Sequence, residues 1–204
     1  MKILNVGCGA TRPKSDELVQ WTNIDNLHWQ LPEDGAARQA LDGEANYLEH
    51  DIANRLPFAD STFDGVLLSH VLEHFDAQQG LQLLCECKRV LNAQGEIVIS
   101  VPDASYFRRV YPRDKNENWQ ELFEVTDVNN PIPTFFEAAL WFDQHLAIMT
   151  EDSLWAYLKM AGFHDMHLLD KGIPWEGSST EAMCKQLNRQ IFSLDVSALK
   201  TKLP

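Results

Sequence analysis

The chain has 204 residues, of which 45% are hydrophobic and 23% are charged, a balance typical of a single globular domain with a substantial core. Its 30 acidic residues outnumber its 17 basic ones, and the net charge of −13 repels phosphate backbones and disfavours a nucleic-acid partner. No window approaches the roughly eighteen apolar residues of a membrane span, and the N-terminus lacks the charged leader and apolar core of a secretory signal.

The first predicted element is a buried strand that begins at Ile3 and runs into the turn Gly7-Cys8-Gly9. An apolar run bounded by glycines is typical of a parallel strand that ends where open α/β sheets bind their ligands. A phosphate-binding loop would need Gly-x-x-x-x-Gly-Lys-Ser/Thr, which does not follow. A dinucleotide site favours a third glycine where Arg12 stands, so a nicotinamide cofactor is disfavoured but stays an alternative. S-adenosylmethionine, which has no pyrophosphate, is the third candidate ligand.

The next strands end in acids. Between the glycine turn and Trp21 there is room for at most a short helix of about two turns. A second strand over residues 21–25 ends in Asp25, whose carboxylate can accept hydrogen bonds from both hydroxyls of a ribose. A third strand over residues 45–51 ends in Asp51, which is placed to accept from an adenine amino group. Acids at strand ends also cap helices and turns, and that role is the alternative for both.

A fourth predicted strand is followed by His70-Val71-Leu72-Glu73-His74-Phe75. Asp76 is the expected cap of a helix that begins at Ala77 and carries apolar residues at helical spacing. The β-branched run at residues 97–99 predicts a central strand. Strands alternating with helices over residues 1–103 indicate a doubly wound, mostly parallel sheet.

Five ordered segments carry a family resemblance: residues 5–9, 23–25, 56–64, 69–75 and 89–103. With them the first half of the chain resembles the class I S-adenosylmethionine-dependent methyltransferases, most closely the compact methyltransferase-11-like branch. The resemblance implies an α/β fold with a Rossmann-like, doubly wound, mostly parallel seven-stranded sheet and an antiparallel edge strand. It also implies S-adenosylmethionine as the cofactor. The chain departs from the family pattern at Asn5, where an acid is common, and at Thr11, where a third glycine is frequent.

The resemblance places the cofactor against the ends of the first four strands. The residues expected to hold it are Asn5, Gly7, Cys8, Gly9, Asp25, Asp51, Ile52, Ser69 and His70. His70 would lie beside the methionine half of the cofactor, and it is one candidate for the base that takes a proton from the acceptor. A packed or capping histidine is the alternative for this position.

His145 is the second candidate base, because the neighbouring Asp143 could orient its ring, and a core histidine is the alternative. His74 stands four residues after His70, a spacing that suggests a pair of metal ligands on a helix. No third ligand follows at a fitting spacing, so we expect no metal.

The second half of the chain has a different texture. Residues 103–150 are rich in aromatic residues, prolines and acids, and we expect an inserted lid that covers the substrate, since no helix precedes the first strand. Thr150 predicts the N-cap of a helix, without a full capping box, and Gly162 predicts its end. Three further elements are expected: a strand over residues 166–169, a short helix from Ser179 and a strand over residues 190–196. The whole chain, residues 1–204, is expected to form one domain.

These observations predict a methyltransferase that acts on a small molecule or a glycan intermediate, on oxygen rather than nitrogen. The alternative is a relative of the same fold that binds the cofactor or a protein partner without catalysis. Neither a nucleic acid nor a membrane is expected as a partner, and a homodimer is one of the oligomeric states left open. The cysteines show no Cys-x-x-Cys spacing, which predicts reduced thiols in a cytoplasmic protein.

Overall fold

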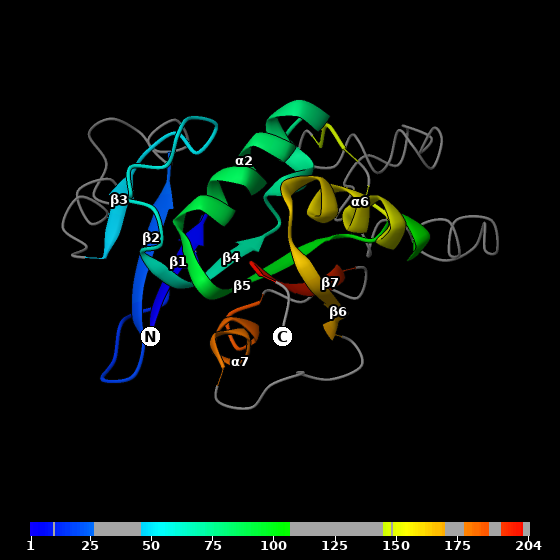
Figure 1. Ribbon diagram of the computed structural model, residues 1–204. Helices are drawn as coiled ribbons and strands as arrows, with labels where there is room; N and C mark the ends of the chain where they lie inside the picture. The colour runs from blue at the N-terminus through cyan, green and yellow to red at the C-terminus, as the bar shows by residue number, and fades with distance from the viewer. Residues whose placement is uncertain are drawn as a thin grey trace, which may run out of the picture.

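The computed structural model describes residues 1–9, 11–26, 46–106, 145–147, 149–169, 178–187 and 193–201. Its strands form a seven-stranded sheet in the order β3-β2-β1-β4-β5-β7-β6 (Figure 1). They are β1 (Lys2–Val6), β2 (Gln20–Asp25), β3 (Tyr47–Glu49), β4 (Phe63–Ser69), β5 (Leu91–Pro102), β6 (His164–Leu168) and β7 (Ser193–Leu199). The first five strands pair in parallel, and β7 runs antiparallel to both β5 and β6. The expected α/β fold with a mostly parallel seven-stranded sheet is confirmed.

The described helices are α2 (Ala77–Val90), α6 (Glu151–Ala161), α7 (Ser179–Cys184) and the short 3-10 helix η2 (Leu72–His74). As the sequence predicts, Asp76 caps α2, and Gly162 ends α6 with a φ of +83°. The cap of α6 is more complete than expected. Ser153 takes the role usual for Glu or Gln, accepting from the Thr150 N–H at 2.8 Å, while its own N–H donates to Thr150 Oγ1 at 3.2 Å. None of these described helices is long and apolar enough to cross a membrane.

Apolar residues alternate along the central strands and are buried on both faces of the sheet. Leu4 and Val66 belong to the larger core cluster, on the face that α2 and α6 cover (Figure 1). Ile3 and Leu67 point the other way and pack with Met183 of α7. A strand whose successive side chains are all buried requires cover on both faces, and the helices supply it.

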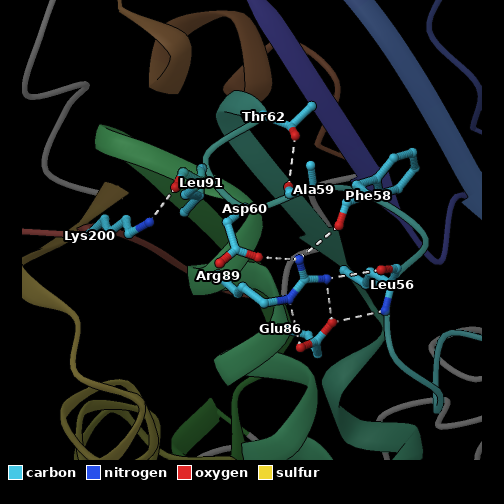
Figure 2. Close-up of polar contacts among 9 residues, drawn as sticks. All are labelled: Leu56, Phe58, Ala59, Asp60, Thr62, Glu86, Arg89, Leu91 and Lys200. Atoms are coloured by element: carbon cyan, nitrogen blue, oxygen red, sulfur yellow. Dashed lines mark hydrogen bonds and ion pairs between the residues drawn. The ribbon is translucent and has the colours of Figure 1, made fainter.

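Arg89, at the end of α2, ties this helix to the segment that precedes β4 (Figure 2). Its guanidinium donates to the Leu56 carbonyl at 2.9 Å, to the Phe58 carbonyl at 2.7 Å and to Asp60 Oδ1 at 2.8 Å. Two further bonds, of 2.9 and 2.7 Å, reach the two carboxylate oxygens of Glu86. The planar fork of an arginine suits several acceptors held at once, so one side chain fixes the entry to β4.

The antiparallel strand lies one position inside the edge of the sheet, because β6 pairs with its outer side. Both C-terminal strands also differ from their predicted bounds: β6 begins two residues earlier than expected, and β7 ends three residues later. The register explains β7, since Val196 faces Ile99 and Ala198 faces Ile97, which places its apolar residues against the buried part of β5. Residues 190–192 of the predicted strand lie outside the described residues.

The segment after the glycine turn corrects the expectation of a short helix, because residues 11–19 contain none. Side-chain amides hold this segment instead. Asn5 donates to the Thr11 carbonyl at 2.8 Å, and Asn23 and Asn46 donate to the Pro13 carbonyl at 3.1 and 2.8 Å. These bonds satisfy carbonyl groups that a helix would otherwise pair internally, so the chain crosses from β1 to β2 as an irregular loop.

Most of the predicted lid over residues 103–150, namely residues 107–144 and 148, lies outside the described residues. Its two described ends lie together. Asp103 forms an isolated parallel bridge with Met149, and the Ala104 N–H donates to the Met149 carbonyl at 2.8 Å. The segment therefore leaves and rejoins the fold at the same place, the end of β5.

Candidate cofactor site and histidine cluster

The glycine turn follows β1, which lies between β2 and β4 in the sheet. Gly7 and Gly9 have φ values of +66° and +49°, a left-handed conformation that side chains rarely adopt. A Cβ atom on Gly7 would lie 2.5 Å from Val71 Cγ2, so this glycine is also required by packing. A Cβ atom on Gly9 would meet nothing within 4 Å, so the backbone there faces open space that a ligand can enter.

Asp25 joins the end of β2 to this turn. Its Oδ2 atom accepts from the Gly9 N–H at 2.8 Å, and its Oδ1 atom accepts from the Asn26 N–H at 2.7 Å. Burial raises the pKa of Asp25, although both hydrogen bonds oppose that rise. Each carboxylate oxygen offers about two acceptor positions, and the bonds to described residues occupy one on each oxygen, so within this part of the chain a second position stays available to a ribose hydroxyl.

The other predicted cofactor residues differ in how deeply they are buried. Ile52 is half-buried, and its Cδ1 atom lies 3.3 Å from the position that a Gly7 Cβ would take. Asn5, on β1, and Cys8, within the turn, are both buried. Asp51 is exposed and accepts from the Ala53 N–H and the Asn54 side chain, each at 3.0 Å. Asp51 thus stabilises a turn in this structure, which is the alternative that its position at a strand end suggested.

His70 follows β4 directly and has a φ of +55°, a strained conformation for a non-glycine residue that costs on the order of 1–3 kcal/mol. Its N–H donates to the Ser100 carbonyl at 2.9 Å. The ring lies between Glu73 and Ser193: Nδ1 is 3.2 Å from Glu73 Oε1, and Nε2 is 3.2 Å from Ser193 Oγ. A hydrogen on Nδ1 would let the ring donate to the Glu73 carboxylate, and this tautomer leaves Nε2 as the acceptor nitrogen.

His145 lies beside His74, although the two residues are far apart in the sequence. Their ring centroids are 4.9 Å apart at an interplanar angle of 75°. The backbone carbonyl of Glu73 holds the two segments together, because it accepts from the Leu146 N–H at 2.8 Å and the Ala147 N–H at 3.0 Å. Asp143, the expected partner of His145, lies outside the described residues.

The sequence-based reasoning missed two residues of this site, Glu73 and Ser193. Glu73 is completely buried, which is rare for an acid, and its only signal in the sequence was its place between two histidines. Ser193 opens β7 and reaches His70 across 123 positions of sequence, a contact for which no local pattern exists.

Comparisons with known proteins agree with this geometry. Residues 4–99, just under half of the chain, match the family model of a methyltransferase domain, and no curated protein matches the sequence. A SAM dependent methyltransferase from Archaeoglobus fulgidus is 20% identical, with 97% of this chain and 85% of that one covered and a TM-score of 0.55. One from Aquifex aeolicus is 16% identical, with 98% and 82% covered and a TM-score of 0.54. The 1,6-didemethyltoxoflavin-N1-methyltransferase of Burkholderia thailandensis, solved with 1,6-didemethyltoxoflavin and S-adenosylhomocysteine, is 18% identical, with 98% and 71% covered and a TM-score of 0.53.

Proposed function

Since residues 4–99 match the model of a methyltransferase domain and the fold is similar to that of S-adenosylmethionine-dependent methyltransferases, we propose that this chain is such an enzyme and methylates an oxygen atom of a small molecule or a glycan intermediate. The observation that carries the proposal is the meeting of the glycine turn, Asp25 and His70 at the carboxyl ends of three adjacent strands. Val6 pairs with both Ile24 and Leu68, so the residues that follow these strands flank one another. Ligands of open α/β sheets bind at this edge.

The described residues fit S-adenosylmethionine at the ribose end. Gly9 leaves open space, and Asp25 keeps acceptor positions in a partly desolvated setting where a hydrogen bond to a carboxylate is strong. Ile52 supplies an apolar surface next to Gly7. Asp51, Ser69 and His70 complete the proposed site around this group. When bound, the cofactor supplies a methyl group activated by its sulfonium sulfur.

His70 is the proposed base at the acceptor end. Glu73 fixes the ring through Nδ1, and Nε2 can then take the proton that an acceptor hydroxyl loses. His145 is the second candidate, since it lies one residue from the backbone bonds that hold the returning segment at Glu73. Holding the acceptor in line with the methyl group and excluding water would contribute more than the base, on the order of 7–11 kcal/mol in favourable systems.

The net charge and one similar protein support the proposed acceptor class. A surface with a net charge of −13 does not attract nucleic acids, which favours a small or neutral acceptor. The Burkholderia enzyme was solved with a small-molecule acceptor bound. None of the four cysteines forms a disulfide, which fits a reducing cytoplasmic setting.

The cofactor part of the proposal is tested by calorimetry. We expect S-adenosylhomocysteine to bind with a micromolar dissociation constant and NAD not to bind. Asp25→Ala should abolish binding, and Asp152→Ala, which removes an exposed acid from the first turn of α6, should leave it unchanged. Absence of binding to the wild-type protein would refute the cofactor assignment.

Catalysis needs a separate test, because a non-catalytic relative would also bind the cofactor. Transfer of a labelled methyl group into a metabolite extract should yield a methyl ether or ester. His70→Ala should lower kcat by about 10²–10⁴-fold while the affinity for S-adenosylhomocysteine changes much less. Cofactor binding without transfer to any acceptor would favour the non-catalytic alternative, and a methylated amine would assign nitrogen instead of oxygen.

A further inference from the structure

Three potential ligands meet at the end of β4. Glu73, His74 and His145 each offer one ligand atom, and these atoms all lie within 4.8 Å of one another. The absence of a third ligand near His74 in the sequence was the reason to expect no metal. The fold supplies that ligand through His145, which the hydrogen bonds from Leu146 and Ala147 to the Glu73 carbonyl hold in place.

The burial of the Glu73 carboxyl group is the second observation. Its side chain is about 1% exposed, and its Oε2 atom is buried without a hydrogen-bond partner among the described residues. Among the ion pairs of those residues, Glu73 contacts only His70, through Oε1. An ionised carboxylate taken out of water costs several kcal/mol unless a cation compensates it, so Oε2 is an acceptor to which a positive ion can bind.

The donor set indicates which ion. Two imidazoles and one carboxylate suit Zn²⁺ and the other first-row transition ions, whereas Mg²⁺ and Ca²⁺ prefer oxygen ligands throughout. Such an ion lies about 2.0–2.2 Å from each donor, so two donors can be at most about 4.3 Å apart. The present limit of 4.8 Å exceeds that spacing by about half an ångström, so binding would require the donors to approach one another by this amount.

We propose that Glu73, His74 and His145 bind one divalent transition-metal ion, with Zn²⁺ as its representative. His70 positions the carboxylate through Oε1, in the way that hydrogen-bonded neighbours orient metal ligands elsewhere. The proposal that this ion binds does not depend on methyl transfer. Three protein ligands leave one position open, as in catalytic and not structural zinc sites. One further step rests on the proposed function: the open position would take the acceptor oxygen, with His145 as a metal ligand and His70 as the base.

The test uses the full-length protein without a polyhistidine tag, stripped of metal by a chelator and titrated with Zn²⁺. Calorimetry and elemental analysis should both find one ion per chain, with a micromolar or tighter dissociation constant. His74→Ala and His145→Ala should each weaken binding by about tenfold or more. His164→Ala, which removes an exposed histidine from β6, should bind Zn²⁺ as the wild-type protein does.

Co²⁺ provides a spectroscopic readout of the ligands. The Co²⁺-loaded protein should show visible d–d absorption, and His145→Ala should lose it. Glu73→Gln should lose it as well. Because Glu73 is buried, circular dichroism must first show that this variant folds, and the two histidine variants decide the question if it does not.

Failure to bind Zn²⁺ at one ion per chain, or binding that persists in both His74→Ala and His145→Ala, would overturn the metal site. Stronger binding of Mg²⁺ than of Zn²⁺ would overturn the choice of ion. Titration of the same samples with S-adenosylhomocysteine separates the two proposals. Zn²⁺ binding without methyl transfer counts against the proposed function alone, and methyl transfer in a protein that binds no Zn²⁺ counts against the metal site alone.

Discussion

Gly7 and Gly9 share a left-handed backbone but differ in their surroundings, so the same substitution should have different effects at the two positions. Gly7→Ala places a methyl group 2.5 Å from Val71 Cγ2 and should lower the free energy of unfolding by about 2–4 kcal/mol. Gly9→Ala meets no atom within 4 Å and should cost only about 1 kcal/mol of backbone strain while weakening cofactor binding. Urea denaturation measures the first effect and calorimetry the second.

A double variant at Gly7 and Val71 provides a control for the packing effect. Val71→Ala removes the methyl groups that a Cβ on Gly7 would meet, so the double variant should recover part of the stability that Gly7→Ala loses beyond the sum of the single effects. Equal destabilisation by the two alanine substitutions would contradict the role of packing at Gly7.

The raised pKa of Asp25 predicts a pH-dependent affinity. Ribose hydroxyls donate to the carboxylate, so protonation removes acceptors and S-adenosylhomocysteine should bind about tenfold more weakly for each pH unit below that pKa. When the pKa of an acid is higher in the folded state than in the unfolded state, the stability of the protein falls as pH rises from the unfolded-state pKa to the folded-state pKa. Protonation of Asp25 at low pH therefore does not itself unfold the protein. Calorimetry between pH 7 and pH 4 measures the effect. Asp25→Asn should bind weakly across the range, and a wild-type affinity independent of pH would exclude the carboxylate from the contact.

At the scale of the elements, the loop between β1 and β2 depends on an amide at position 5. Asn5 is 2% exposed and donates to both the Thr11 carbonyl and Asn23 Oδ1. Asn5→Asp, the acid that is common in the family, keeps the shape but cannot donate, and it turns a charged acceptor toward two other acceptors. We expect a loss of about 1–3 kcal/mol in unfolding free energy, at least as large as for Asn5→Ala. An aspartate variant as stable as the wild-type protein would show that the amide does not hold the loop.

The Arg89 network predicts a second stability effect at this scale (Figure 2). Arg89→Met should lower the free energy of unfolding at pH 7 by about 1–3 kcal/mol, because it leaves the Leu56 and Phe58 carbonyls and Glu86 without their donor. Lys185→Met is the matched control. Its ion pair with Glu181 is exposed, and its loss should cost less than about 0.5 kcal/mol.

Hydrogen bonding to Arg89 lowers the pKa of Glu86. A lowered folded pKa means that the carboxylate stabilises the protein above its unfolded pKa, and that this contribution is lost as pH falls through the folded value. The difference in stability between wild-type protein and Arg89→Met should therefore shrink on acidification below about pH 4. A difference that stays constant down to pH 2 would contradict this assignment.

Across the whole molecule, the parallel half of the sheet could be predicted, and the C-terminal half only in part. β1 and β4 contain local apolar runs, and β2 alternates apolar with polar residues before it ends in Asp25, and such patterns can be recognised within a few residues. The place of β7 depends on pairing with β5, about one hundred residues earlier in the chain. The helix expected after the glycine turn was wrong because three asparagine side chains, from separate strands and loops, decide that segment.

The candidate site follows the same division. Gly7, Gly9 and Asp25 end neighbouring strands, so their proximity could be inferred from chain order alone. The contact of His74 with His145 could not be inferred, because 71 positions separate the two residues. It depends on tertiary contacts such as the bridge between Asp103 and Met149. The burial of Glu73 also arises from packing and leaves no trace in local sequence.

The place of β7 between two earlier strands has a consequence for biosynthesis. At roughly 5–20 residues per second, a ribosome needs on the order of 5–20 seconds to pass from the end of β5 to the start of β7. During that interval β5 exposes an unpaired edge, a template for association with other nascent chains. Ser193 also arrives with this strand, so His70 gains its Nε2 partner only after 123 further positions of the chain have been synthesised. The surroundings of His70 therefore stay incomplete until β7 joins the sheet.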